Sequence, residues 1–235
     1  KPAGTQIGLD TFPMSSVLSP DGKYLLVLNA GYRPPSVSVF PVDTMKESAR
    51  VPVPNAWLGL AFAPDGSRVY VGGGAKNAIY EFGFANGTLS AGRTFEIVRG
   101  STPGNDDFIG DVTLSPDGRL IYASDLYHNA VAVVNPQSGL VVERRRVGRR
   151  PYRILFHPDG KSYFVSSWAD GMVYQYETAT GNEMNRIRVG AHSTDLVISD
   201  RRVITDNDAG TGDPSSRYRL FVAAANTNSV YSVGI

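Results

Sequence analysis

Apolar and polar residues alternate along most of the chain in short runs, separated by clusters of Gly, Pro, Asn and Asp. The run YLLVLN at residues 24–29 is one example, and the shorter run SSVLS at residues 15–19 precedes it. Alternating runs of this length, rich in Val, Tyr, Ile and Phe, are typical of half-buried strands. The pattern therefore predicts an all-β protein with many tight turns.

The triplet Pro-Asp-Gly stands between paired apolar runs four times, with its prolines at positions 20, 64, 116 and 158. The successive spacings are 44, 52 and 42 residues. In each copy a strand precedes the triplet and a second follows it, then come a polar loop, a third strand, a second turn and a more polar fourth strand. Four antiparallel strands per unit at a period of this size predict a β-propeller.

The aspartates of the four triplets have an explanation in turn chemistry. Pro presets the first corner of a turn, Asp bonds the backbone two residues further on, and Gly adopts the positive φ of a tight hairpin. We therefore interpret Asp21, Asp65, Asp117 and Asp159 as turn residues and not as catalytic carboxylates.

A fifth unit is visible but altered. Its strands are expected at residues 194–199, 219–225 and 229–235, with a long polar segment in place of the triplet and no fourth strand. Two arrangements are open: residues 5–9 supply the missing outer strand, or the five units belong to a larger propeller of seven blades. We expect one propeller region over residues 1–235, with blades at about 12–52, 53–100, 108–148, 149–190 and 191–235 and with residues 1–11 as a candidate closing strand.

Composition narrows the function. The chain has 235 residues, a formal net charge of +1 and no cysteine. The lack of cysteine excludes disulfides, zinc–thiolate sites, iron–sulfur clusters and a cysteine nucleophile. No apolar run approaches the roughly 18 residues needed to span a bilayer, and neither a G-x-S-x-G elbow nor a phosphate-binding loop is present. We expect no cofactor.

The phrases SPDGKYLLVLN, SPDGRLIYASD and RLFVAAANTNSVYSV resemble the repeat of YVTN-type, YncE-like β-propellers, and the resemblance covers nearly the whole chain. That family includes surface-layer proteins, lactonase-like propellers and propellers fused to an alkaline-phosphatase-like phosphoesterase domain; the last group is the most similar in its long hairpin insertion. The resemblance implies a seven-bladed ring and an exported protein, periplasmic or extracellular, although no signal peptide opens this chain. No metal-binding catalytic residue is carried over from the phosphoesterase domain.

In a propeller, the loops between blades and those between second and third strands gather on one face, where repeat folds place their function. Arg, aromatic and acidic residues in these loops suit a small anionic or sugar-like ligand, since guanidinium groups bind anions and rings contact apolar faces. The candidate residues are Tyr32, Arg33, Trp57, Asp111, His128, Arg149, Arg150, Tyr152, Arg153, Trp168, His192 and Asp195; Tyr127 and Asp170 lie in the same loops.

Three other features have competing explanations. In the basic run at 144–153, Arg144 and Arg146 alternate on an outer strand and are interpreted as edge protection, and we do not expect nucleic-acid binding at so small a patch. Asp206, Asp208 and Asp213 resemble a calcium loop, although the bidentate Glu of an EF-hand is missing. His128, His192 and Asp195 have no spacing that requires a metal.

The sequence therefore predicts an exported, non-catalytic binding or scaffold propeller that presents this loop face to a ligand or a protein partner. The alternative is a hydrolase-associated propeller, either a lactonase that polarises a ring carbonyl with His, Arg and carboxylates, or the accessory part of a metal-dependent phosphoesterase. Whether the chain is an enzyme is left open by the sequence.

Overall fold

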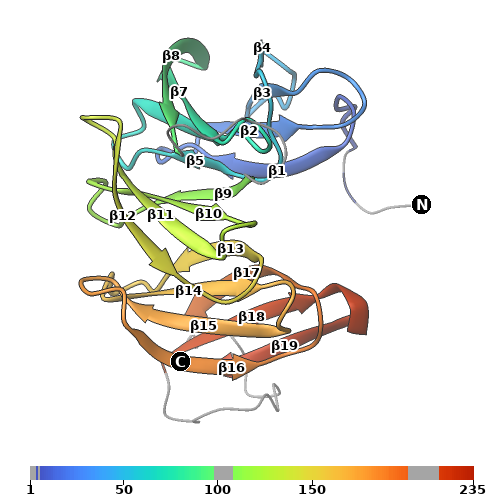
Figure 1. The fold of residues 1–235 in the computed structure, drawn as a ribbon. Helices are drawn as coiled ribbons and strands as arrows, with labels where there is room; N and C mark the ends of the chain where they lie inside the picture. Colours follow the sequence, from blue (N-terminus) through green and yellow to red (C-terminus); the bar gives the residue numbers. More distant parts are fainter. Residues whose placement is uncertain (1–3, 5, 98–107, 201–216) are drawn as a thin grey trace. The chain divides into compact units, whose positions relative to one another are not determined.

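The computed structural model describes residues 4, 6–97, 108–200 and 217–235. Its described part forms five antiparallel sheets in chain order (Figure 1). The first two sheets contain β1 (Pro13–Leu18), β2 (Tyr24–Asn29), β3 (Ser36–Pro41), β4 (Ala49–Pro52), β5 (Leu60–Phe62), β6 (Arg68–Gly72), β7 (Ala78–Ala85) and β8 (Thr88–Glu96).

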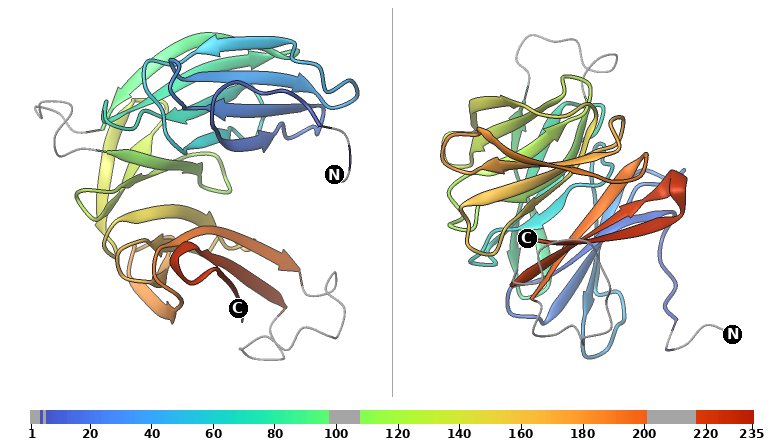
Figure 2. Two further views of the ribbon diagram at one scale, coloured as in Figure 1. Left: turned by 90° about the vertical axis from the view of Figure 1, so that its right-hand side faces the viewer. Right: turned by 90° about the horizontal axis from the view of Figure 1, so that it is seen from below.

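The next two sheets are again four-stranded, and the last has three strands (Figure 2). Their elements are β9 (Ile109–Leu114), β10 (Ile121–Asp125), β11 (Ala130–Asn135), β12 (Leu140–Arg146), β13 (Pro151–Phe156), β14 (Ser162–Ser167), β15 (Met172–Glu177), β16 (Glu183–Arg188), β17 (Ser193–Asp200), β18 (Tyr218–Ala224), the 3-10 turn η2 (Ala225–Thr227) and β19 (Ser229–Gly234). This repetition confirms the all-β propeller prediction. Residues 6–12 form no strand.

The Pro-Asp-Gly triplets form the turns between the first and second strands, as predicted. In the third sheet, the Asp117 carboxylate accepts hydrogen bonds from the Ser115 hydroxyl at 2.6 Å and from the Arg119 amide at 3.1 Å. Gly118 has φ +70°, a conformation that glycine adopts without steric cost. The recurring aspartates therefore stabilise hairpins.

In three of the sheets, the pairing of the first strand with the second shifts register near the start of the first strand, as at a β-bulge. The register shifts between Pro13 and Ser15 in β1, between Pro151 and Ile154 in β13, and between Ser193 and Leu196 in β17. A bulge re-aims the side chains beside it. The bulges in β13 and β17 lie at the strand ends that adjoin the loops between sheets, so they decide where the first side chains of these strands point.

The described chain divides into two compact units: Lys1–Ala123 with Val133–Val142, and Ser124–Ala132 with Glu143–Ile235. Each has its own core of strand residues. In the first unit, Leu26, Val39 and Val71 are fully buried, and in the second unit Phe164 and Leu220 are. No helix in the described ranges is long and apolar enough to cross a membrane.

Candidate functional site

Four short loops of the second unit lie at matching strand ends, at residues 126–129, 147–150, 168–171 and 189–192. In the fourth sheet, Pro151 pairs with Ser167, and Ser167 pairs with Met172. The loop before β13 and the loop between β14 and β15 are therefore at the same end of this sheet. We call these four loops the loop cluster.

Arg149 and Arg150, between β12 and β13, are held through their backbone. The Asp170 carboxylate accepts hydrogen bonds from the Arg149 amide at 2.7 Å and from Arg149 Nε at 2.6 Å, and the Ser167 hydroxyl donates to the Arg149 carbonyl. Burial raises the pKa of Asp170, but the hydrogen bonds from Arg149 and Ser167 outweigh it and bring this pKa below its ordinary value. The ionised Asp170 carboxylate therefore holds the segment that connects β12 to β13.

Arg150 occupies a constrained position in this link. Its φ is +55°, which is uncommon for a residue other than Gly, Asn or Asp. The Asn129 side chain accepts from its amide at 2.9 Å, and its carbonyl accepts from the Trp168 amide at 3.1 Å. The guanidinium carbon lies 4.3 Å from the ring centroid of Tyr127. Arg150 thus presents an oriented cation, the geometry that binds carboxylate and oxyanion groups.

Beside Arg150, a buried carboxylate holds a histidine. Asp125 is the last residue of β10, and its side chain is fully buried. Its Oδ2 lies 2.9 Å from His128 Nδ1 and 3.1 Å from Arg144 Nη1. With a carboxylate as its partner, Nδ1 carries the hydrogen, so Nε2 of the neutral ring carries the lone pair. The His128 side chain is 45% exposed, so solvent reaches the imidazole.

Trp168 and His192 form a flat stack in the same cluster. Their ring centroids are 3.8 Å apart and their planes differ by 4°. His192 has φ +57°, and its carbonyl accepts a hydrogen bond from the Ala225 amide at 3.1 Å. Trp168 is 39% exposed, so part of the indole surface faces solvent.

The predicted loop residues divide between several neighbourhoods. His128, Arg149, Arg150, Trp168 and His192 come together in the loop cluster, and Arg153 pairs with Asp195 through Nε and Oδ1 at 2.9 Å. The Tyr152 carbonyl accepts a hydrogen bond from the Ser124 hydroxyl at 3.5 Å.

In the first unit, the predicted residues have other partners. Arg33 lies 5.9 Å from the ring of the exposed Tyr32 and 3.5 Å from Asp10, and Trp57 packs edge-to-face with Phe108. Asp111 lies in β9 and is 2% exposed, so it is not an open loop carboxylate. The ligand role of all these residues stays a prediction.

Sequence reasoning missed Asp125, Asn129 and the contact of Arg144. Arg144 was expected to protect a strand edge, but it donates to the buried Asp125. Asp125 lies at the end of an apolar strand and three residues before His128, and this spacing was the available signal. Asn129 precedes β11 with φ +52°, and Asn is a residue that tolerates this conformation.

Metal ligation has no support among the described residues, where no group of three or more His, Asp or Glu side chains is arranged to hold an ion. The candidate calcium residues Asp206, Asp208 and Asp213 lie outside the described residues. Their role stays a prediction.

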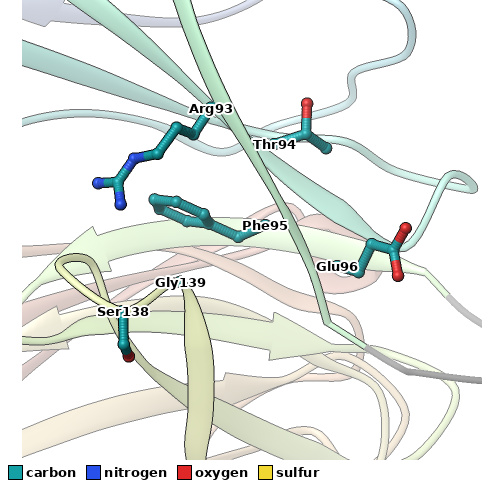
Figure 3. A pocket seen from close by; sticks show the side chains of 6 residues that line it. All are labelled: Arg93, Thr94, Phe95, Glu96, Ser138 and Gly139. Atoms are coloured by element: carbon teal, nitrogen blue, oxygen red, sulfur yellow. The ribbon is translucent and has the colours of Figure 1, made fainter.

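Two hollows lie away from the loop cluster. One, of about 400 Å³, lies in the first unit beside β8 and the β11–β12 turn. Figure 3 shows the Arg93 guanidinium beside the Phe95 ring, with Ser138 below them. This guanidinium donates to both Glu81 oxygens at 3.0 Å and to the carbonyls of Pro136 and Gln137. Arg93 therefore connects two sheets of this unit.

The other hollow, of about 280 Å³ in the second unit, is lined by His157, Lys161 and Gln175 among others. His157 stands where the other units have Ser or Ala before Pro-Asp-Gly, and its Nδ1 lies 2.8 Å from Asp159. The ring of His157 also packs edge-to-face on Tyr218. These contacts give His157 a structural explanation as a turn residue.

The family model described as "Lactonase, 7-bladed beta-propeller" matches residues 15–184. This match spans more than half of the chain, and the chain belongs to this family of seven-bladed β-propellers. The prediction of a lactonase-like propeller is thereby confirmed, while the YVTN and YncE-like assignment stays a prediction. No curated protein matches the chain.

Solved structures agree on the fold. Hydrazine synthase from Kuenenia stuttgartiensis aligns with a TM-score of 0.68 at 18% identity, over 100% of this chain and 70% of that one. A functionally unknown protein from Desulfotomaculum acetoxidans has a TM-score of 0.71 at 18% identity, over 98% and 70%. The periplasmic gluconolactonase PpgL from Pseudomonas aeruginosa has a TM-score of 0.63 at 26% identity, over 78% of this chain and 55% of that one.

Proposed function

We propose that this chain hydrolyses a lactone in the loop cluster, with His128 as the general base and Arg150 as the group that stabilises the oxyanion. One observation carries the proposal: three consecutive residues, 127–129, bring both groups together. Tyr127 stacks on the Arg150 guanidinium, His128 is held by the buried Asp125, and the Asn129 side chain accepts the Arg150 amide hydrogen.

The proposed reaction needs one water and one proton carrier. His128 Nε2 removes a proton from water while the water oxygen attacks the lactone carbonyl carbon. The carbonyl oxygen becomes an oxyanion that the Arg150 guanidinium stabilises. The tetrahedral intermediate then collapses with cleavage of the ring C–O bond, and His128 returns its proton to the departing oxygen. The product is an open-chain hydroxy acid, which ionises to its carboxylate at neutral pH.

Asp125 would act on His128 in two ways. It orients the imidazole through Nδ1, and it stabilises the imidazolium that forms when Nε2 takes a proton, as the carboxylate does in a catalytic triad. Arg144 contacts the same carboxylate and fixes its position. Family membership supports this hydrolase alternative, whereas the non-catalytic scaffold role, the phosphoesterase association and the exported location stay predictions.

The test measures proton release after the purified chain is mixed with δ-valerolactone or with D-glucono-δ-lactone. The rate of spontaneous lactone hydrolysis is subtracted. We expect hydrolysis by the wild type and a loss of roughly 10²–10⁴-fold in kcat for His128→Gln, the range for a general base. His157→Gln is the matched control, because His157 is also paired with an aspartate but lies in a turn; it should retain the wild-type kcat. Binding of either compound without turnover in the wild type would reject the proposal and favour the scaffold prediction.

A further inference from the structure

The loop cluster repeats one arrangement in successive blades. Arg150 immediately precedes β13 and His192 immediately precedes β17, and both have positive φ, +55° and +57°. Each stacks against an exposed aromatic residue of a loop between second and third strands, Arg150 on Tyr127 and His192 on Trp168. The same position therefore holds a guanidinium in one blade and an imidazole in the next.

The Trp168 stack is fixed on both sides. The Trp168 amide donates to the Arg150 carbonyl at 3.1 Å, and His192 is tied to η2 through the Ala225 amide. The near-parallel rings, 3.8 Å apart, make one rigid slab with an exposed indole. A rigid aromatic surface loses little conformational freedom when a ligand packs on it.

We propose that Trp168, backed by His192, is a specificity-determining platform that binds the closed ring of the lactone and not the open chain of its product. This inference rests on the proposed function. A five- or six-membered lactone presents a flat face of C–H groups, which packs on an indole. Ring opening converts that face into a flexible chain, which would have to lose rotational freedom to make the same contact.

The hydrogen bond between the Trp168 amide and the Arg150 carbonyl joins the backbones of the two residues, so the platform residue and the proposed oxyanion-stabilising residue are neighbours in the loop cluster. The proposal places a ring on Trp168 with its carbonyl at Arg150. The arrangement explains how one site holds the substrate and releases the product: Arg150 attracts the product carboxylate, but the platform contact is lost.

The experiment uses D-glucono-δ-lactam, which keeps the ring but replaces the ester by an amide, and D-gluconate, which is the open chain. The protein has two tryptophans, so Trp57→Phe leaves Trp168 as the reporter in fluorescence titrations, and calorimetry measures both affinities independently. We expect the lactam to change Trp168 emission and to bind roughly tenfold more tightly than gluconate, and we expect Trp168→Ala to abolish this preference. Trp168→Phe should retain part of it.

Tyr127→Ala is the matched control, since Tyr127 is the equivalent aromatic residue of the preceding blade. It should weaken both compounds, because both contact Arg150, and leave the preference for the ring, because Trp168 sets that preference. All titrations are repeated in the His128→Gln variant, which lacks the proposed general base. The binding result then does not depend on whether the protein hydrolyses lactones. Equal affinities of the wild type for the two compounds, no binding of either, or an undiminished preference in a folded Trp168→Ala protein would each overturn the platform, even if lactone hydrolysis is observed.

Discussion

Arg153 and Asp195 occupy the same bulge position in successive blades and form an ion pair, with Arg153 Nε 2.9 Å from Asp195 Oδ1. Arg153 lies in the bulge that opens β13 and Asp195 in the bulge that opens β17. Their backbones are linked through Ser166, whose hydroxyl accepts the Arg153 amide hydrogen and donates to the Thr194 carbonyl. The ion pair therefore adds a side-chain contact between two blades whose backbones are already joined through Ser166.

This pair should contribute little stability on its own. The Asp195 side chain is 60% exposed, and exposed ion pairs contribute about 0.2–1 kcal/mol. We expect a double-mutant cycle of Arg153→Met and Asp195→Asn, measured by urea unfolding, to give a coupling energy below about 1 kcal/mol that falls further in 1 M NaCl because salt screens exposed charges. A larger coupling that is insensitive to salt would show that the pair is more shielded than its exposure indicates.

Replacing Asp125 should affect both catalysis and stability. Asp125→Asn keeps the shape but removes the charge that His128 and Arg144 contact. If the proposed hydrolysis is correct, kcat should fall by about 10²–10⁴-fold, as for a lost triad carboxylate, and unfolding free energy by about 1–3 kcal/mol. Asp159→Asn, which alters the exposed aspartate paired with His157 in a turn, serves as the control and should retain kcat. Wild-type kcat in Asp125→Asn would contradict the assigned role of His128.

Gly148 is a packing constraint on the Arg149–Arg150 link. A Cβ at this position would lie 2.2 Å from Tyr174 Cε2 and 2.9 Å from the Ser167 Cβ. Gly148→Ala should therefore destabilise the protein by about 1–3 kcal/mol, the cost typical of overpacking, as measured by urea unfolding. Gly8→Ala is the control, because no atom lies within 4 Å of its added Cβ, and it should change stability by less than about 0.5 kcal/mol. Equal effects of the two substitutions would reject this explanation.

Stability should depend on Asp170 in acid. Its pKa in the folded chain lies below the ordinary value of 3.8, so the folded state binds fewer protons than the unfolded state near that pH. The stabilisation from this carboxylate is fully present above pH 3.8 or so and is lost as pH falls through the lower folded pKa. We expect the stability difference between wild type and Asp170→Asn, from urea unfolding between pH 7 and pH 2, to be constant above about pH 5 and to shrink below pH 4. A difference that grows in acid would reverse the assigned sign.

The repeat architecture was accessible from sequence because its signals are local. Each Pro-Asp-Gly turn, such as that at Asp117, forms from residues within a few positions of one another, and the strand runs on either side carry their own alternation. The loop cluster was accessible in part: Arg149, Trp168 and His192 were placed in the correct loops by strand counting alone.

The partners of these residues were not accessible. Arg150 contacts Asn129, which is 21 positions away in the sequence, and Arg153 contacts Asp195, which is 42 positions away. The residues that flank each of them in the sequence do not indicate these partners. Arg144 shows the same difficulty, since alternation placed it on an exposed strand and only the end of β10 explains its contact with Asp125.

By itself, the sequence determined the strand content, the turn chemistry, the period of the units and the propeller class, because each depends on residues close together in the chain. Only the tertiary structure decided which loop residues meet. That outcome depends on the stacking of successive sheets, on the bulges that open β13 and β17, and on the positive φ of Arg150 and His192. These features direct side chains through space, and a one-dimensional pattern of apolar and polar residues does not encode that direction.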